Sequence, residues 1–283
     1  MIVHTSIPDF KAFRNSLTEK IGFVPTMGAL HEGHLSLIRK SKSENRKTCC
    51  SIFVNPIQFN NPDDFSKYPK VLDRDLELLE REGCDVVFVP TEQEMYPVAP
   101  KIKFDFGSLE TVMEGTFRPG HFNGVAIVVS RLFHIVQPHV SYFGRKDLQQ
   151  TKVIEQLVSD LQFPLEVKVC DTWRELDGLA MSSRNARLST QQRAGAAILY
   201  KELVKAKEAV CKGQSCASVT KGAIIAIEAL DGVRAEYFQI VDASSLLPFI
   251  DEPKGEVAIC VAAYFGEVRL IDNVVFRISK GTN

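Results

Sequence analysis

Short apolar runs alternate with longer amphipathic segments between residues 21 and 169 of this 283-residue chain. Such alternation is typical of βα units, which build a mostly parallel sheet covered by helices. The spacing predicts strands and helices in turn at 21–24, 35–43, 49–54, 72–82, 85–89, 124–136, 140–143, 148–161 and 165–169. The sequence therefore predicts an open α/β domain that occupies residues 1–171.

The pattern changes after residue 171. A polar loop at 173–188 is followed by two amphipathic segments, which predict helices at 191–212 and 218–230. Three apolar runs near the end of the chain predict strands at 235–240, 257–265 and 267–275, with the last two joined as a hairpin at Gly266. We therefore expect a second, smaller α+β domain over residues 172–283.

The composition excludes several classes of protein. Hydrophobic residues make up 45% of the chain and charged residues 24%, as in globular proteins. Lys and Arg number 34 and Asp and Glu 35, so the formal charge of −1 gives no overall positive field for nucleic acid or acidic membranes. No apolar run approaches the roughly 20 residues of a membrane span, and the N-terminus lacks the pattern of a secretory signal. We expect a cytoplasmic protein without nucleic-acid or membrane partners.

The segment 25–34, Pro-Thr-Met-Gly-Ala-Leu-His-Glu-Gly-His, lies between the first predicted strand and the first predicted helix. A helix N-terminus presents unpaired N–H groups to an anion, and ligands of open α/β sheets bind beyond the carboxyl ends of strands. Gly28 and Gly33 allow close backbone approach, and His31 and His34 can face the same ligand. The segment matches neither a P-loop nor a GxGxxG or HExxH motif. It predicts a phosphate site, with a plain turn and two surface histidines as the structural alternative.

Two further polar groups follow predicted strands. Gly144 ends a strand, so Lys146 and Asp147 could contact a phosphate and a ribose hydroxyl, although a solvated ion pair would have the same sequence. Gln58 follows the second strand, where its uncharged amide could hold a hydroxyl or carboxylate group, or could be an ordinary loop residue.

The loop segment Met181-Ser-Ser-Arg-Asn185 combines two hydroxyls with a guanidinium, a combination that can wrap phosphate oxygens. It could instead cap the next helix. Ser189 is better placed for that cap, which leaves Ser182 and Ser183 without an expected structural role.

Six blocks in the same order resemble the pantoate–β-alanine ligase family, the pantothenate synthetases, whose His-x-Gly-His signature places them among the HIGH nucleotidyltransferases. The blocks are 25–37, 54–59, 68–70, 118–124, 143–150 and 177–185. The resemblance implies a Rossmann-like nucleotide-binding domain with an open parallel sheet and a smaller C-terminal domain that acts as a lid over the substrates.

The resemblance also implies roles for individual residues. The implied catalytic residues are His31, His34, Lys146 and Arg184, and the implied pantoate and β-alanine site has Gln58 and Gln150. The implied ATP contacts are Met27, Gly28, His31, His34, Gly144, Arg145, Lys146, Asp147, Trp173, Met181, Ser182, Ser183 and Arg184. Two of these depart from the family: Arg145 replaces a glutamate, and we expect it to point to solvent, whereas Trp173 replaces an aliphatic residue that contacts adenine through its backbone.

The activity implied by the family is an ATP-dependent condensation of pantoate with β-alanine through a pantoyl adenylate, which releases pyrophosphate and AMP. Mg²⁺ would arrive on the nucleotide, and no protein ligand for it is assigned, because Asp73 and Asp75 beside Arg74 favour a charged helix face. The family also implies a homodimer. A nucleotidylyltransferase acting on a phosphorylated acceptor and a non-catalytic nucleotide sensor remain alternatives, whereas length and neutral charge disfavour a tRNA synthetase.

Overall fold

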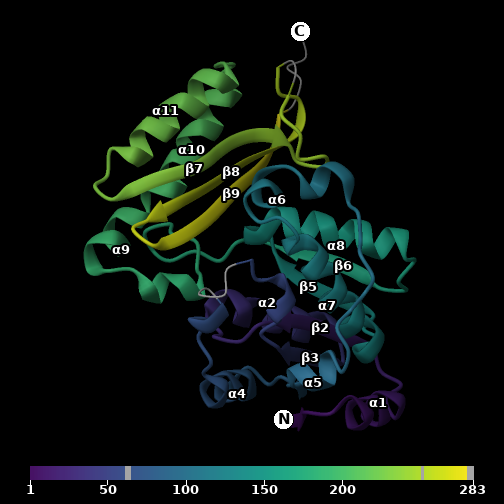
Figure 1. Cartoon of the computed structure of the whole chain (residues 1–283). Coiled ribbons are helices and arrows are strands. Elements are labelled where there is room, and N and C mark those ends of the chain that lie inside the picture. The colour runs from purple at the N-terminus through teal and green to yellow at the C-terminus, as the bar shows by residue number, and fades with distance from the viewer. Residues whose placement is uncertain (61–64, 250–251, 279–283) are drawn as a thin grey trace. The chain divides into compact units, whose positions relative to one another are not determined.

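The computed structural model describes residues 1–60, 65–249 and 252–278 (Figure 1). Two compact units divide the chain. The first contains 1–110, 114–145 and 150–171, and the second contains 111–113, 146–149 and 172–283. The main change of unit falls where the sequence predicts a domain boundary, but two short segments of the predicted first domain cluster with the second unit.

A six-stranded sheet forms the centre of the first unit, with the strand order β1-β4-β3-β2-β5-β6 and parallel pairing throughout. Its strands are β1 (Ile2–His4), β2 (Ile21–Thr26), β3 (Lys47–Ile52), β4 (Val86–Phe88), β5 (Val140–Gly144) and β6 (Glu166–Cys170). From β2 the chain adds strands first on one side, through β3, and later on the other, through β5. The switch in strand order at β2 marks the usual ligand site of such sheets, beyond the carboxyl ends of the strands.

Neighbouring residues of the strands supply two hydrophobic cores, one on each face of the sheet. Phe23, Cys49 and Val86 pack with α1 (Ile7–Asn15), α7 (His121–Val136) and α8 (Leu148–Asp160). The next residue of each strand, Val24, Cys50 and Val87, packs with α2 (Glu32–Glu44) and α4 (Leu72–Arg81). This alternation follows from the period of two in an extended strand, with both faces covered as parallel sheets require.

The second unit contains a three-stranded antiparallel sheet, β7 (Val233–Asp242), β8 (Gly255–Phe265) and β9 (Val268–Ile278), packed against α10 (Ile198–Cys211) and α11 (Cys216–Glu228). The predicted hairpin is confirmed, because β8 and β9 pair from Phe265 and Val268 outward, with Gly266 in the left-handed conformation at the turn. The two sheets confirm the predicted fold class of an α/β first domain and an α+β second domain. Figure 1 shows α10 and α11 against one face of the second sheet.

Three details differ from the sequence prediction. The predicted helix at 191–212 is two helices, α9 (Thr190–Ala196) and α10, which meet at Ala197; Gly195 in that region lies against Leu230 and weakens helix formation. Pro25 does not end β2, which continues to Thr26. Strand β1 and helix α1 were not predicted, although Ser6 caps α1 by accepting from the backbone of Asp9, a recognisable helix start.

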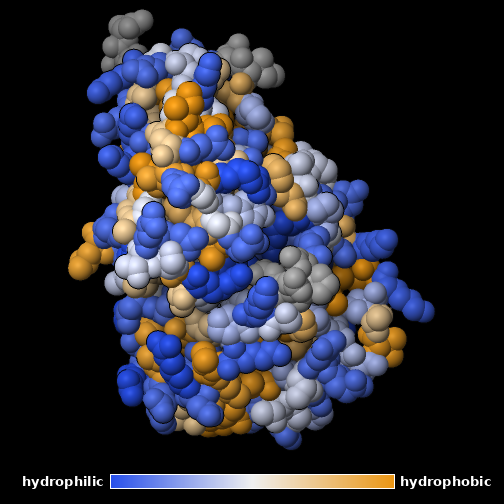
Figure 2. Space-filling model, turned by 60° about the vertical axis from the view of Figure 1, so that its left-hand side comes forward, coloured by the Kyte–Doolittle hydropathy of each residue, from blue (hydrophilic) through white to orange (hydrophobic). Residues whose placement is uncertain are grey.

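The shorter elements are η1 (Pro56–Gln58), α5 (Glu92–Met95), η2 (Gly107–Glu110), α6 (Met113–Phe117), η3 (Arg145–Asp147) and η4 (Ser183–Arg187). None of the helices in the described part of the chain is long and apolar enough to cross a membrane. The face drawn in Figure 2 is largely hydrophilic, with hydrophobic side chains in separate groups.

A polar cluster at the end of α2 predicts a pH-dependent contribution to stability. The Glu44 carboxylate pairs with Lys40 and Lys168 and accepts from the Tyr142 hydroxyl. These contacts, led by the one from Lys40, lower the pKa of Glu44 from 4.5 to about 2.

Because the pKa of Glu44 is lower in the folded than in the unfolded protein, the stabilisation is present above the unfolded pKa and is lost as the pH falls through the folded pKa. Urea unfolding should therefore show Glu44→Gln less stable than wild type near neutral pH, with the difference shrinking as the pH falls from about 4.5 to about 2. An equal difference near neutral pH and at about pH 2 would contradict this.

Candidate active site

The turn that follows β2 has an unusual backbone. Gly28 and Ala29 both have positive φ angles, 81° and 50°, and an alanine adopts that region only at a cost in free energy. The Thr26 hydroxyl donates to the Ser51 carbonyl and accepts from the Gly28 amide, which joins the turn to β3. The turn leads directly into α2, whose N-cap is His31.

Asp75 holds this turn in place. Its side chain is 1% exposed, and its two carboxylate oxygens accept from the backbone amides of Ala29 and Leu30, each at 2.8 Å. Burial raises the pKa of Asp75, while the two amides oppose that shift. The interpretation of Asp75 as part of a charged helix face is therefore wrong, whereas Asp73 is exposed as expected. The position of Asp75 one helical turn before the fully buried Leu79 is the sequence signal that identifies its buried face.

His31 and His34 lie side by side at the first turn of α2, with ring centroids 4.1 Å apart. The Nδ1 atom of His31 accepts from the Gly33 amide at 3.2 Å, and Nδ1 of His34 accepts from the His31 amide at 3.4 Å. A backbone amide can only donate, so Nδ1 of each ring is unprotonated in this arrangement and Nε2 carries the proton. That the two histidines face one ligand stays a prediction, and Gly33 lies inside the helix rather than in the turn.

Gln58 lies in η1, directly after β3, and is 8% exposed. Its Nε2 donates to the sulfur of Met27 at 3.1 Å, which joins the segment after β3 to the turn after β2. Gly124 also belongs to this region. A Cβ atom there would lie 2.5 Å from the Ile57 carbonyl oxygen, so the close approach that this glycine permits is to η1.

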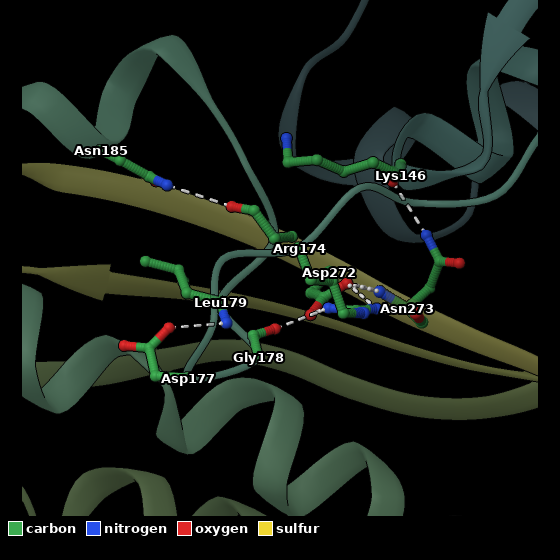
Figure 3. A network of polar contacts seen from close by, with 9 residues as sticks. Lys146, Arg174, Asp177, Gly178, Leu179, Asn185, Asp272 and Asn273 are labelled. Atoms are coloured by element: carbon green, nitrogen blue, oxygen red, sulfur yellow. Dashed lines mark hydrogen bonds and ion pairs between the residues drawn. The ribbon is translucent and has the colours of Figure 1, made fainter. Parts of the chain in front are cut away.

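Lys146 belongs to the second unit together with the loop that carries Ser182, Ser183 and Arg184. The Asn273 side chain on β9 donates to the Lys146 carbonyl at 2.8 Å, and the Lys146 side chain extends away from that contact (Figure 3). This bond joins Lys146 to the C-terminal sheet.

Arg174 joins the beginning of the same loop to β9. Its guanidinium forms a two-pronged ion pair with Asp272 at 2.6 and 2.9 Å and donates to the Gly178 carbonyl (Figure 3). It also covers the ring of Tyr200. Asp272 is 3% exposed. A charge pair removed from water to this extent depends on both partners, so it holds the loop and the strand in one arrangement.

Three expectations about the loops need correction or refinement. Ser189 caps α9 in a reciprocal pair with Gln192, as expected, but Ser182 also has a structural role, because its hydroxyl caps η4 by accepting from the Arg184 amide. Arg145 does not simply point to solvent, since its Nε lies 3.2 Å from the Asp171 carboxylate. The Trp173 carbonyl accepts from the Met181 amide, while its side chain is 44% exposed.

The predicted site residues thus form two groups. In the first unit, Gln150 lies in the first turn of α8. The other predicted residues of this unit lie at the ends of β2, β3 and β5 or in the segments that follow them: Met27, Gly28, His31, His34, Gln58, Gly144 and Arg145. The second unit carries Lys146, Asp147, Trp173, Met181, Ser182, Ser183 and Arg184. Across the described residues, no three His, Cys, Asp or Glu side chains gather where they could hold a metal ion.

The turn predicts a strong response to Asp75→Asn. An asparagine keeps one acceptor oxygen but presents an NH₂ group to the second backbone amide, so a buried donor loses its partner at a cost of about 1–3 kcal/mol. We expect a loss of that size in the free energy of unfolding measured with urea. Asp73→Asn on the same helix is the matched control and should change it little; equal effects of the two substitutions would contradict the role assigned to Asp75.

The Arg174–Asp272 pair predicts local loosening in Asp272→Asn. Removing one partner leaves a buried guanidinium uncompensated, which typically costs about 3–5 kcal/mol. Amide hydrogen exchange in residues 174–185 should accelerate, whereas Asp231→Asn, at an exposed position in the same unit, should leave it unchanged. Unaltered exchange in the Asp272 variant would show that the pair does not hold the loop.

Comparison with known proteins agrees with this arrangement. The family model described as pantoate–β-alanine ligase matches residues 2–275. The pantothenate synthetase of Cytophaga hutchinsonii is 48% identical over 282 residues, which cover 97% of this chain and 99% of that protein. The pantothenate synthetase of Bacteroides fragilis is 45% identical, with 98% of this chain and 99% of that protein covered.

Solved structures of pantothenate synthetases are similar to this chain over nearly its full length. The pantothenate synthetase from Thermus thermophilus superposes with a TM-score of 0.91 at 43% identity, over 97% of this chain and 99% of that one. The pantoate–β-alanine ligase from Francisella tularensis, solved in complex with "beta-gamma ATP" and β-alanine, has a TM-score of 0.81 at 38% identity and 97% coverage of both chains. The parallel sheet, the His-x-Gly-His helix start and these similarities over nearly the full length together show that the chain belongs to the pantoate–β-alanine ligase family of enzymes.

Proposed function

We propose that this enzyme condenses pantoate with β-alanine at the expense of ATP, through a pantoyl adenylate, and releases pyrophosphate and AMP. The observation that carries the proposal is the pair of imidazole rings at the N-terminus of α2, each accepting a backbone amide at Nδ1, at the switch point of the sheet. The Francisella relative supports the choice of substrates, because its complex contains an ATP species and β-alanine.

The chemistry requires activation of the acid. A carboxylate is a poor electrophile because its leaving group would be oxide. The pantoate carboxylate oxygen attacks the α-phosphorus of ATP, a P–O bond forms, and the bond to pyrophosphate breaks. The β-alanine amine then attacks the acyl carbon, AMP leaves with the former carboxylate oxygen, and the amine loses a proton.

Positioning and charge neutralisation accomplish this without a covalent enzyme intermediate. The Nε2–H groups of His31 and His34 donate to phosphate oxygens, where the positive end of α2 adds to their effect, and His34 is our candidate proton donor. Lys146, Ser182, Ser183 and Arg184 neutralise the charge that develops on the α-phosphate and on pyrophosphate. Gly28 and Met27 lie against the nucleotide, as do Gly144, Asp147, Trp173 and Met181.

Gln58 and Gln150 orient pantoate through its hydroxyl and carboxylate oxygens. Magnesium commonly binds through substrate phosphates and water with few protein ligands. On ATP it would supply further charge neutralisation.

Because an acyl adenylate reacts with water, we assign the second unit the role of a lid. We also propose that the enzyme is a homodimer located in the cytoplasm. Light scattering would test whether two chains associate.

A nucleotidylyltransferase is the competing function, and ATP–pyrophosphate exchange separates the two. We expect exchange of labelled pyrophosphate into ATP to require pantoate and to proceed without β-alanine. Exchange that depends on a phosphorylated acceptor, and not on pantoate, would overturn the ligase proposal, whereas ATP binding without exchange would favour a sensor.

The role of His34 predicts a loss of adenylation in two variants. His34→Ala removes the ring, and His34→Gln removes it while keeping an acceptor for the His31 amide, as glutamine does in a capping box. Loss of one donor to a developing oxyanion typically costs about 100- to 1000-fold. Both variants should lose that much exchange activity, with His34→Gln folded as wild type. His134→Ala, an exposed histidine of the same unit, is the control; near-normal exchange in His34→Gln would remove the role.

A further inference from the structure

A chain of buried polar groups leads from α7 and Tyr96 to Gln58. Asn55 is 1% exposed, and its Nδ2 donates to the Gly124 carbonyl at 3.1 Å and to the Gln58 Oε1 at 3.0 Å. The Tyr96 hydroxyl lies 2.8 Å from the Asn55 Oδ1. Because Tyr96 is 9% exposed and Gln58 8%, water does not readily replace these bonds.

The direction of every bond in this chain follows from one group. The Gly124 carbonyl can only accept, so the Asn55 amide must turn its NH₂ toward it. The oxygen of the Asn55 amide then faces Tyr96, so the Tyr96 hydroxyl must donate to it. The second N–H of Asn55 faces Gln58 and therefore requires the Gln58 carbonyl oxygen there.

With its oxygen held by Asn55, Gln58 can turn only its NH₂ group toward the turn after β2. That group meets the Met27 sulfur at 3.1 Å, and a thioether is a weak acceptor. A ligand oxygen would therefore be a better partner for this donor than Met27 is.

The backbone of Gln58 is fixed as well. The His121 Nδ1 is bonded to the Gln58 carbonyl at 2.9 Å, and a Cβ on Gly124 would lie 2.7 Å from the Gln58 Cα. Rotation of the Gln58 amide by 180° would set its NH₂ against the NH₂ of Asn55. The amide is thus held in one orientation by groups that lie behind it.

We propose that Tyr96 is a positioning residue that, through Asn55, fixes the Gln58 amide as a hydrogen-bond donor to pantoate. The pantoate subsite then selects a ligand that offers an acceptor oxygen at this point and discriminates against one that offers only a donor. The inference rests on the proposed function, since it takes pantoate to be the ligand of Gln58.

Tyr96→Phe tests the inference in the complete chain. The variant keeps the ring and the Gly124 contact but leaves the Asn55 oxygen without its donor, so the Asn55 and Gln58 amides are held less firmly in this orientation. We expect the KM for pantoate to rise about five- to tenfold, the effect of one hydrogen bond, with the KM for ATP unchanged within about twofold. Tyr142→Phe is the matched control, because its buried hydroxyl bonds Glu44 and Asn45 instead. It should leave the KM for pantoate unchanged.

A double-substitution cycle separates positioning from a general structural effect. If Tyr96 acts through Gln58, Tyr96→Phe should add almost nothing to the KM for pantoate in a Gln58→Ala background. Additive effects, or an equal rise in the KM for ATP, would overturn the inference. Where Tyr96→Phe is too unstable to assay, the side-chain NH₂ resonances of ¹⁵N-glutamine-labelled wild-type protein give a second test. The Gln58 pair should shift on adding pantoate alone, and an unmoved pair would overturn the inference.

Failure of the proposed function has a different outcome. If Gln58→Ala leaves the KM for pantoate unchanged, Gln58 is not a pantoate ligand, and both the assignment and the inference fail. If Gln58→Ala raises the KM but Tyr96→Phe does not, only the positioning role is overturned.

Discussion

The two hydrogen bonds from the Ala29 and Leu30 amides to the Asp75 carboxylate are the interaction on which the rest of the site depends. They stabilise a turn whose backbone would otherwise be unfavourable, and that turn sets where α2 begins. The two histidines of the first turn of α2 are in place only because the helix starts there, and their mutual bonds to the backbone fix which ring nitrogen carries the proton. A carboxylate on a neighbouring helix thus positions the imidazole donors of the β2–α2 turn without being near them in sequence.

In the second unit, too, a buried carboxylate holds a loop in place, here through an ion pair with Arg174. Arg174 and Asp272 join the loop of Ser182 and Ser183 to β9, and the next residue of that strand, Asn273, holds the backbone of Lys146. The cations Lys146 and Arg184, which we assign to phosphate, therefore belong to one unit, whereas the two histidines and Gln58 belong to the other.

Local patterns in the sequence predicted most of the fold. Apolar spacing identified every strand of both sheets except β1, whose three residues are too few for a periodic signal, and the hairpin at Gly266 followed from its turn. The histidine pair was predictable because the helix start and the three-residue spacing are both local.

Asp75 was misjudged because its charge suggested exposure to solvent, and only its spacing from Leu79 indicates the buried face. Ser182 was misjudged because a short 3₁₀ helix leaves little trace in sequence. Tyr96 contacts Asn55 across 41 positions of the chain, and no local pattern contains such a contact.

The central claim is that the pantoate carboxylate attacks the α-phosphorus of ATP, and the fate of its oxygen atoms tests this most directly. Reaction of pantoate labelled with ¹⁸O in both carboxylate oxygens should yield AMP with one ¹⁸O atom, and pantothenate that retains the other in its amide, as mass spectrometry would show. Unlabelled AMP, with ¹⁸O in inorganic phosphate or pyrophosphate instead, would contradict the account.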